Sequence, residues 1–263
     1  MDHDKPVGSI LESVYVIARK MLVAGLCGWL LLATAVAWGE KDKGKDKDNQ
    51  VDSGSFGVFV GGQRMGTETF SVRQDASGLS TISAQLKQEG SNTPAQTSEM
   101  KVSSGGAMVN YEWHELTPDK TEVQVVPNNE FLIERVTENP GDKPKEQPFL
   151  LPNTSLILDN NFFVQREVLA WRYLASACAT VSGQLKCDPA QFGVVVPQER
   201  VSTRVTVSPG SPEKLMIHGT ERQLVRLGLK TEDGEWNLWL DPLDHFKLIR
   251  VVKVGENTEI LRD

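Results

Sequence analysis

The sequence has few of the residues from which catalytic and metal centres are usually built, with three cysteines and four histidines among 263 residues. It contains no Gly-x-Ser-x-Gly turn to present a nucleophilic serine and no glycine-rich phosphate-binding loop. His114-Glu115 begins like a zinc-protease helix, but Pro118 stands where the second histidine would be needed. We therefore expect no catalytic residues, no metal site and no cofactor, and we predict that the protein is not an enzyme.

Positive charge is also in short supply. The 28 lysines and arginines are outnumbered by 35 aspartates and glutamates, which gives a formal net charge of −7 and a sequence pI of about 5.3. Nucleic-acid binding needs basic patches that neutralise phosphates and release counterions. We therefore expect no nucleic-acid partner.

One long apolar run lies near the start of the chain. Residues 21–38, MLVAGLCGWLLLATAVAW, carry no charge and follow Arg19 and Lys20. The pattern is typical of a signal peptide with a small-residue cleavage site at Ala35-Val36-Ala37, and the run is also just long enough for an uncleaved anchor. Residues 1–38 are predicted to be a signal peptide or signal anchor. We expect an exported protein of the periplasm or cell envelope, with the inner membrane as a partner through residues 21–38 if they are not cleaved.

A polar segment follows the apolar run. Residues 39–54, GEKDKGKDKDNQVDSG, alternate lysine and aspartate and contain one large apolar side chain, Val51. Such a segment cannot bury enough apolar surface to offset its chain entropy. We predict a charged flexible linker over residues 39–54 and one domain over residues 55–263.

Polar and apolar residues alternate through most of this domain, with turn residues between the runs. Tyr111 and Trp113, for example, share one face of a predicted strand, and Glu112 and His114 share the other. A polar break interrupts the pattern at residues 138–148. The pattern predicts a mainly β, antiparallel domain with strands at residues 56–60, 64–73, 79–88, 108–116, 121–126, 130–137, 192–196, 201–207, 215–219, 222–230, 235–240, 245–254 and 259–262.

The spacing of apolar residues changes once, in the segment DNNFFVQREVLAWRYLASAC. Phe162, Leu169 and Tyr173 fall at helical spacing, and Trp171 widens the apolar arc. Asp159 and Asn160 precede the run and are candidate N-caps. We predict an amphipathic helix at about residues 160–177, packed against the sheet.

Cys178 and Cys187 are the cysteines that follow the apolar run. In an oxidising compartment such a pair is most simply a disulfide. Two free buried thiols are the alternative, whereas a zinc site would need two more ligands that the neighbouring sequence does not offer.

Asp241, Asp244 and His245 gather in one predicted turn. Aspartate in a proline-containing turn usually accepts hydrogen bonds from the backbone. We favour this turn chemistry over the alternative of a metal or acid–base site.

Three segments carry a resemblance to a known family: the opening FGVFVGGQRMGTETFSV, the central LILDNNFFVQREVLAWRYL and the closing EWNLWLDPLDHFKLIRVVKV. The chain resembles bacterial envelope proteins with a LolA-like lipoprotein-carrier half-barrel, in particular their relatives of unknown function. The resemblance implies an incomplete antiparallel barrel wrapped around one helix, often with a lipid on its concave face. It implies no catalytic residues.

These observations favour a non-catalytic module that binds a lipid or other hydrophobic ligand in a half-barrel cleft. The alternatives are a structural or assembly factor of the cell envelope that acts through protein–protein contacts, and an enzyme of unrecognised class. The residues expected to line the cleft are the aromatic residues of the helix and of the closing strand: Phe162, Phe163, Trp171, Tyr173, Trp236 and Trp239.

Overall fold

The computed structural model describes residues 49–129, 131–152, 154–232 and 234–263. The predicted signal segment, residues 1–38, and residues 39–48 of the predicted linker lie outside these ranges. Within the described ranges, no helix is both long enough and apolar enough to cross a membrane.

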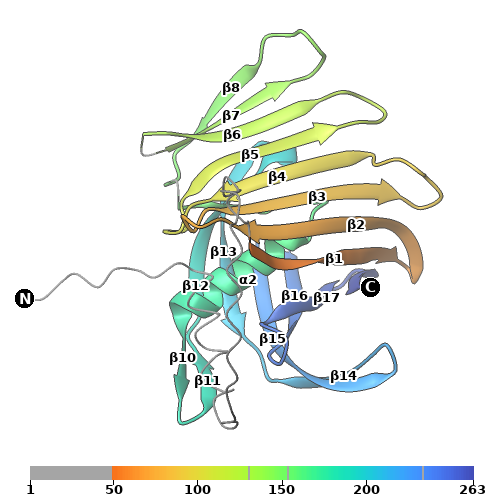
Figure 1. The fold of residues 1–263 in the computed structure, drawn as a ribbon, viewed down its shortest axis with the longest axis vertical. Helices are drawn as coiled ribbons and strands as arrows, with labels where there is room; N and C mark the ends of the chain where they lie inside the picture. The colour runs from red at the N-terminus through yellow and green to blue at the C-terminus, as the bar shows by residue number, and fades with distance from the viewer. Residues whose placement is uncertain (1–48, 130, 153, 233) are drawn as a thin grey trace, which may run out of the picture.

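One sheet of sixteen strands forms most of the molecule (Figure 1). Its pairing order is β8-β7-β6-β5-β4-β3-β2-β1-β18-β17-β16-β15-β13-β12-β9, and β14 pairs with β15 beside this path. All pairs are antiparallel except β9 with β12. The strands are β1 (Asn49–Val60), β2 (Gln63–Gln74), β3 (Ser80–Gln88), β4 (Gln96–Val102), β5 (Met108–Glu115), β6 (Glu122–Asn128), β7 (Phe131–Thr137), β8 (Lys145–Phe149), β9 (Leu156–Ile157), β12 (Ala190–Val196), β13 (Val201–Pro209), β14 (Glu213–Ile217), β15 (Thr220–Thr231), β16 (Gly234–Asp241), β17 (Lys247–Lys253) and β18 (Thr258–Arg262).

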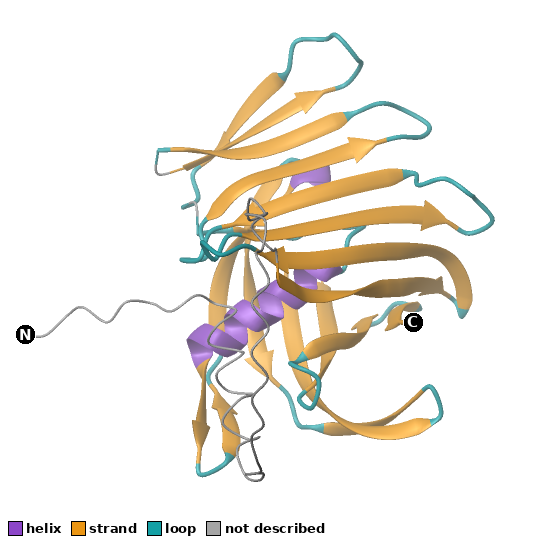
Figure 2. Cartoon of the chain, in the orientation of Figure 1, coloured by secondary structure: helices purple, strands orange, loops and turns teal. Residues whose placement is uncertain are grey.

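The sheet is an incomplete barrel around one α-helix, α2 (Val164–Ala177) (Figure 2). Strands β8 and β9 end the pairing order and do not pair with each other, so the barrel stays open. Nine residues of α2 are buried, because side chains from both halves of the sheet pack around it. The predicted fold class, a mainly β antiparallel half-barrel wrapped around an amphipathic helix, is confirmed.

The helix starts later than predicted, at Val164, and neither Asp159 nor Asn160 caps it. The first free N–H groups of the helix are bound instead by Glu68 on β2, whose carboxylate accepts from Phe163 N (2.6 Å) and Val164 N (3.1 Å). A carboxylate at a helix N-terminus satisfies orphan donors and faces the positive end of the helix dipole. The sheet therefore sets where α2 begins.

The predicted linker also ends earlier than expected, because residues 49–54 belong to β1. They pair with the end of β2, from Asn49 opposite Gln74 to Gly54 opposite Phe70. Asp52 is buried and forms an ion pair with Arg262. Backbone pairing and this ion pair hold a segment that has too few apolar side chains to fold by burial alone.

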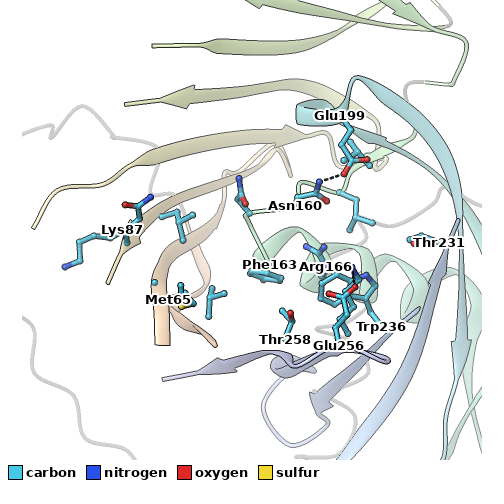
Figure 3. A pocket seen from close by; sticks show the side chains of 18 of the residues that line it. Met65, Lys87, Asn160, Phe163, Arg166, Glu199, Thr231, Trp236, Glu256 and Thr258 are labelled. Carbon is cyan, nitrogen blue, oxygen red and sulfur yellow. Dashed lines mark hydrogen bonds and ion pairs between the residues drawn. The ribbon is translucent and has the colours of Figure 1, made fainter. Parts of the chain in front are cut away.

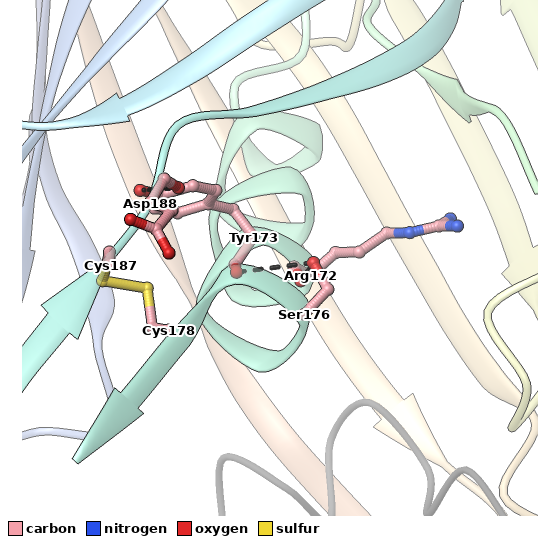
Figure 4. The surroundings of a disulfide bond; sticks show 6 residues. All are labelled: Arg172, Tyr173, Ser176, Cys178, Cys187 and Asp188. Atoms are coloured by element: carbon pink, nitrogen blue, oxygen red, sulfur yellow. Dashed lines mark hydrogen bonds between the residues drawn. A yellow bond between two sulfur atoms is a disulfide. The ribbon is translucent and has the colours of Figure 1, made fainter. Parts of the chain in front are cut away.

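Cys178 and Cys187 are joined by a disulfide, with their sulfur atoms 2.05 Å apart (Figure 4). They close a small hairpin of β10 (Cys178–Val181) and β11 (Gln184–Cys187), which directly follows α2. The Asp188 amide donates to the carbonyl of Ala177 (3.0 Å), and the hydroxyl of Tyr173 donates to the carbonyl of Asp188 (3.0 Å). These bonds attach the hairpin to the last turns of the helix.

Candidate functional site

A cleft of ≈ 410 Å³ lies at the start of α2 (Figure 3). Apolar side chains from three regions line it: Val58, Met65 and Leu86 from β1, β2 and β3, Leu158 and Phe163 from the segment before the helix, and Val196 and Trp236 from β12 and β16. Polar side chains, among them Lys87, Asn160, Glu199, Lys253 and Glu256, also line it. The cleft thus combines an apolar interior with polar groups, as small-molecule sites commonly do.

Arg166 lines the cleft beside two aromatic rings, those of Phe163 and Trp236 (Figure 3). Its guanidinium carbon is 4.7 Å from the centroid of the Phe163 ring and 4.8 Å from that of the Trp236 ring. A guanidinium over an aromatic face is attracted by the negative face of the ring, and more strongly where water is excluded. The two rings are also close to each other, with centroids 6.4 Å apart and planes tilted by 56°. We call the three side chains the Phe163–Arg166–Trp236 cluster.

Arg166 is 2% exposed, and burial lowers its pKa to about 10 while Asp159 and Glu68 act to raise it. Nη1 donates to the carbonyls of Asp159 (3.0 Å) and Phe162 (3.5 Å). Among the described residues, no carboxylate lies within ion-pair distance of the guanidinium, and the buried Nε has no hydrogen-bond partner. The Arg166 side chain thus lines the cleft without an ion-pair partner among the described residues, and its Nε is enclosed by protein.

Glu68 lies beneath the same site and is fully buried. Burial raises its pKa to about 8, although the two backbone N–H bonds from Phe163 and Val164 act in the opposite direction. Desolvation disfavours the charged form of a carboxyl, whereas bonds to its oxygens favour that form. The oxygens of Glu68 are directed to the helix N-terminus and not to the guanidinium of Arg166.

A buried polar network fixes the loop that precedes α2. Gln165 Oε1 accepts from the Asp159 amide (2.6 Å), and Asp159 Oδ1 accepts from the Asn161 amide (2.7 Å). The other oxygen of Asp159 accepts hydrogen bonds from the Tyr111 hydroxyl and the Gln198 amide. Burial raises the pKa of Asp159, and these bonds oppose the change. The loop, and with it the floor of the cleft, is therefore formed before any ligand arrives.

Two pairs of polar side chains in the lining of the cleft are bonded to each other. Lys253 Nζ lies 2.5 Å from Glu256 Oε1 and 5.6 Å from the centroid of the Trp236 ring. Asn160 Nδ2 donates to Glu199 Oε1 (2.5 Å) (Figure 3). Arg166 therefore differs from these groups in having a buried donor without a partner.

A second buried charge network lies on the sheet at another face of α2. Glu167 Oε1 accepts from the Leu248 amide (2.7 Å) and from Arg262 Nη1 (3.2 Å). Arg262 also pairs with Asp52 and lies over the rings of Phe56 and Phe70. Burial raises the pKa of Glu167, and Arg262 opposes the shift. This network joins β1, α2, β17 and β18, and none of its residues lines the cleft.

Two of the six predicted ligand-binding residues, Phe163 and Trp236, line the cleft. Phe162, Trp171 and Tyr173 are instead buried in the core between the helix and the sheet. Trp239 lies in a separate small cluster with Ile217, Leu224 and Ile249, and its Nε1 donates to Glu213 (2.9 Å). Side chains at positions 236 and 239 of one strand point to opposite faces, which explains the division.

The space beneath the middle of the helix is nearly filled. A cavity of ≈ 30 Å³ lies there beside Trp171, whose Nε1 donates to the carbonyl of Phe246 (2.9 Å). The helix is thus packed against the sheet along its length, and open volume remains at its start.

The sequence analysis did not single out Arg166 and Glu68 as site residues. Both carried a visible signal, since Arg166 falls within the aromatic part of the predicted helix and Glu68 shares a strand face with Phe70 and Val72. A charged residue on an apolar face is either paired internally or functional.

The predicted turn chemistry of Asp241 is confirmed. Its Oδ1 accepts from the Leu243 amide (2.9 Å), and its Oδ2 accepts from Arg222 (2.9 Å). In the part of the chain that the structure describes, no group of three or more histidine, cysteine, aspartate or glutamate side chains could hold a metal ion.

No protein-family model matches the sequence, and no curated protein matches it significantly. Among solved structures, the crystal structure of a beta-barrel-like protein of domain of unknown function DUF1849 from Brucella abortus is similar. The identity is 8% and the TM-score 0.47, over 80% of this chain and 94% of that chain.

Proposed function

We propose that the protein is an exported, non-catalytic binding module of the cell envelope, and that the cleft at the start of α2 holds a lipid or another hydrophobic ligand. The observation that carries the proposal is an open cleft of ≈ 410 Å³ lined by the Phe163–Arg166–Trp236 cluster. Small-molecule sites commonly have volumes of about 300–1,000 Å³ and a mainly apolar lining.

The apolar lining can supply the affinity. Burial of apolar surface contributes about 25 cal/mol per Å², so one acyl chain can reach micromolar affinity without a specific polar contact. The cleft is also preorganised, because the Asp159 network and Glu68 hold the loop and the helix start in place. A site that is already ordered loses little conformational entropy when it binds.

The proposed location rests on the sequence. The apolar run over residues 21–38 favours export, and a bonded Cys178–Cys187 pair suits an oxidising compartment. Lipids and lipid-like molecules are abundant in the cell envelope, so a protein at that location would be exposed to such ligands.

The proposal is tested by titrating the protein with N-phenyl-1-naphthylamine, a neutral fluorescent hydrophobic dye. Saturable binding is expected, and Trp236→Ala should weaken it about tenfold or more, because the indole is part of the cleft floor. Trp239→Ala is the matched control, since Trp239 lies on the same strand but faces away from the cleft.

A second pair of variants tests the mouth of the cleft without touching the core. Met65 lines the cleft and is 51% exposed, whereas Met216 is 66% exposed and lies elsewhere. Met65→Glu should weaken dye binding and Met216→Glu should not. If the unmodified protein shows no saturable binding, the alternative of a structural or assembly factor becomes the better interpretation.

A further inference from the structure

Arg166 is the feature of the cleft that hydrophobic binding alone does not use. Arg166 is 2% exposed, and its side chain lines the cleft. Its Nε has no hydrogen-bond partner among the residues described. A buried charged donor without a partner is unfavourable by itself, so proteins usually provide it with an acceptor. The Nε itself is enclosed by protein, but the Arg166 side chain lines the cleft, where an acceptor that enters would meet the guanidinium.

The neighbouring carboxylates do not fill this role. Glu68 directs its two oxygens to the amides of Phe163 and Val164, and Asp159 directs its own to Tyr111, Gln198 and the Asn161 amide. Both balance the charge of Arg166 from a distance, but within the described ranges neither forms an ion pair with it. The planar fork of a guanidinium suits carboxylate and phosphate oxygens, which it can bind through two parallel N–H groups.

We infer that the ligand is an amphiphile with an anionic oxygen group, a carboxylate or a phosphate, and that Arg166 binds this group while the apolar lining holds the chain. This inference rests on the proposed function and specifies its ligand class. Phe163 and Trp236 have a second role in it, because both rings pack against the guanidinium and restrict its orientation. A second unpartnered buried atom, Thr203 Oγ1, also belongs to a residue that lines the cleft.

The test is competition against N-phenyl-1-naphthylamine with four ligands that differ only in the head group: decanoate, decyl phosphate, decanol and decylamine. Decanoate and decyl phosphate should displace the dye with dissociation constants at least tenfold lower than decanol, and decylamine should bind no better than decanol. Inorganic phosphate alone should not displace the dye, because it lacks the chain.

Arg166→Met tests the residue directly. In this variant the dissociation constants of decanoate and decyl phosphate, each divided by that of decanol for the same variant, should rise about tenfold or more, so that the preference for the anionic head groups is lost. An unchanged ratio would overturn the role of Arg166. Arg166→Lys keeps the positive charge but loses the planar guanidinium. Its dissociation constants for decanoate and decyl phosphate should lie between those of the unmodified protein and those of Arg166→Met.

The outcomes separate this inference from the function on which it rests. Dye binding with equal affinities for decanoate and decanol would overturn the anionic head group and leave the hydrophobic cleft intact. This comparison uses the unmodified protein, so it holds even if Arg166→Met fails to fold. If inorganic phosphate displaces the dye as effectively as decyl phosphate does, Arg166 binds free anions, and the inference that the ligand is an amphiphile is overturned. Absence of any dye binding would overturn the proposed function itself.

Discussion

At the scale of single residues, three fully buried glutamates stand out: Glu68, Glu134 and Glu167. Burial raises the pKa of Glu68 to about 8 and that of Glu134 to about 7, from an ordinary value of 4.5, and it also raises the pKa of Glu167. At a pH between the ordinary pKa and the raised pKa, these carboxyls keep their protons in the folded protein but have released them in the unfolded chain. The free energy of unfolding therefore falls as the pH rises through this range.

We predict that stability declines from pH 5 to pH 8, by at most about 1.4 kcal/mol per pH unit for each such group. Glu68→Gln removes one titrating carboxyl and should make the decline shallower. Urea unfolding at four pH values measures both slopes, with Glu89→Gln as the control because Glu89 is exposed. An unchanged slope in Glu68→Gln would show that this carboxyl keeps an ordinary pKa.

Glu68 also shows where reasoning from the sequence reaches its limit. Asp159 and Asn160 have suitable side chains immediately before the helix, and local sequence therefore favours them as caps. The actual cap comes from a residue 95 positions earlier in the chain, on a strand that reaches the helix only in the folded barrel. Local patterns carry no information about such a contact.

At the scale of elements, alternation predicted most strands because it follows from one face being buried. Five strands, β4, β8, β9, β10 and β11, are absent from the predicted set. In β8 only Phe149 is buried. This edge strand therefore has a polar sequence without alternation, which looks like the sequence of a loop.

For the cleft, the sequence identified the aromatic residues but not the direction in which each side chain points. It could not show that Phe163 and Trp236 line the cleft whereas Trp171 and Tyr173 lie in the core. Burial by a distant part of the sheet decides which ring is accessible.

The disulfide hairpin β10–β11 leads to a prediction about one element. Replacing Cys178 and Cys187 with serine should lower the free energy of unfolding by about 2–3 kcal/mol, because the unfolded chain is no longer constrained. Dye affinity should stay unchanged, since the hairpin follows the end of α2 and the cleft lies at its start. Unfolding and titration of the same preparation measure both quantities. A parallel loss of affinity would mean that the hairpin also controls the helix start.

At the scale of the whole molecule, the first and last described strands pair with each other. Phe56 on β1 lies opposite Arg262 on β18, and Arg262 also binds Asp52 and Glu167. This pairing connects the β2–β8 meander to the strands β12–β17, so the two halves of the sheet depend on it.

We predict that a chain beginning at Asn49 folds as stably as the longer protein, and that a chain beginning at Ser55 loses about 3–5 kcal/mol. The shorter chain lacks Asp52 and leaves Arg262 without one of its buried partners. Urea unfolding of the two chains measures the difference, and Asp52→Ala in the longer chain should reproduce most of it. Equal stability of both chains would mean that the first part of β1 is dispensable.

The same strand order constrains the sequence of events in which the chain can fold. Each hairpin from β1 to β8 can form as soon as its residues are available, because its partners are close in sequence. The β1–β18 pair must wait, since Ser55 and Asp263, which bond across it, are 208 residues apart. Closing so long a loop is slow, and until then β1 is an open strand edge that can pair with other chains. Newly made chains should therefore be most prone to aggregation before β18 pairs with β1, and a chaperone that covers the free edge of β1 would protect them.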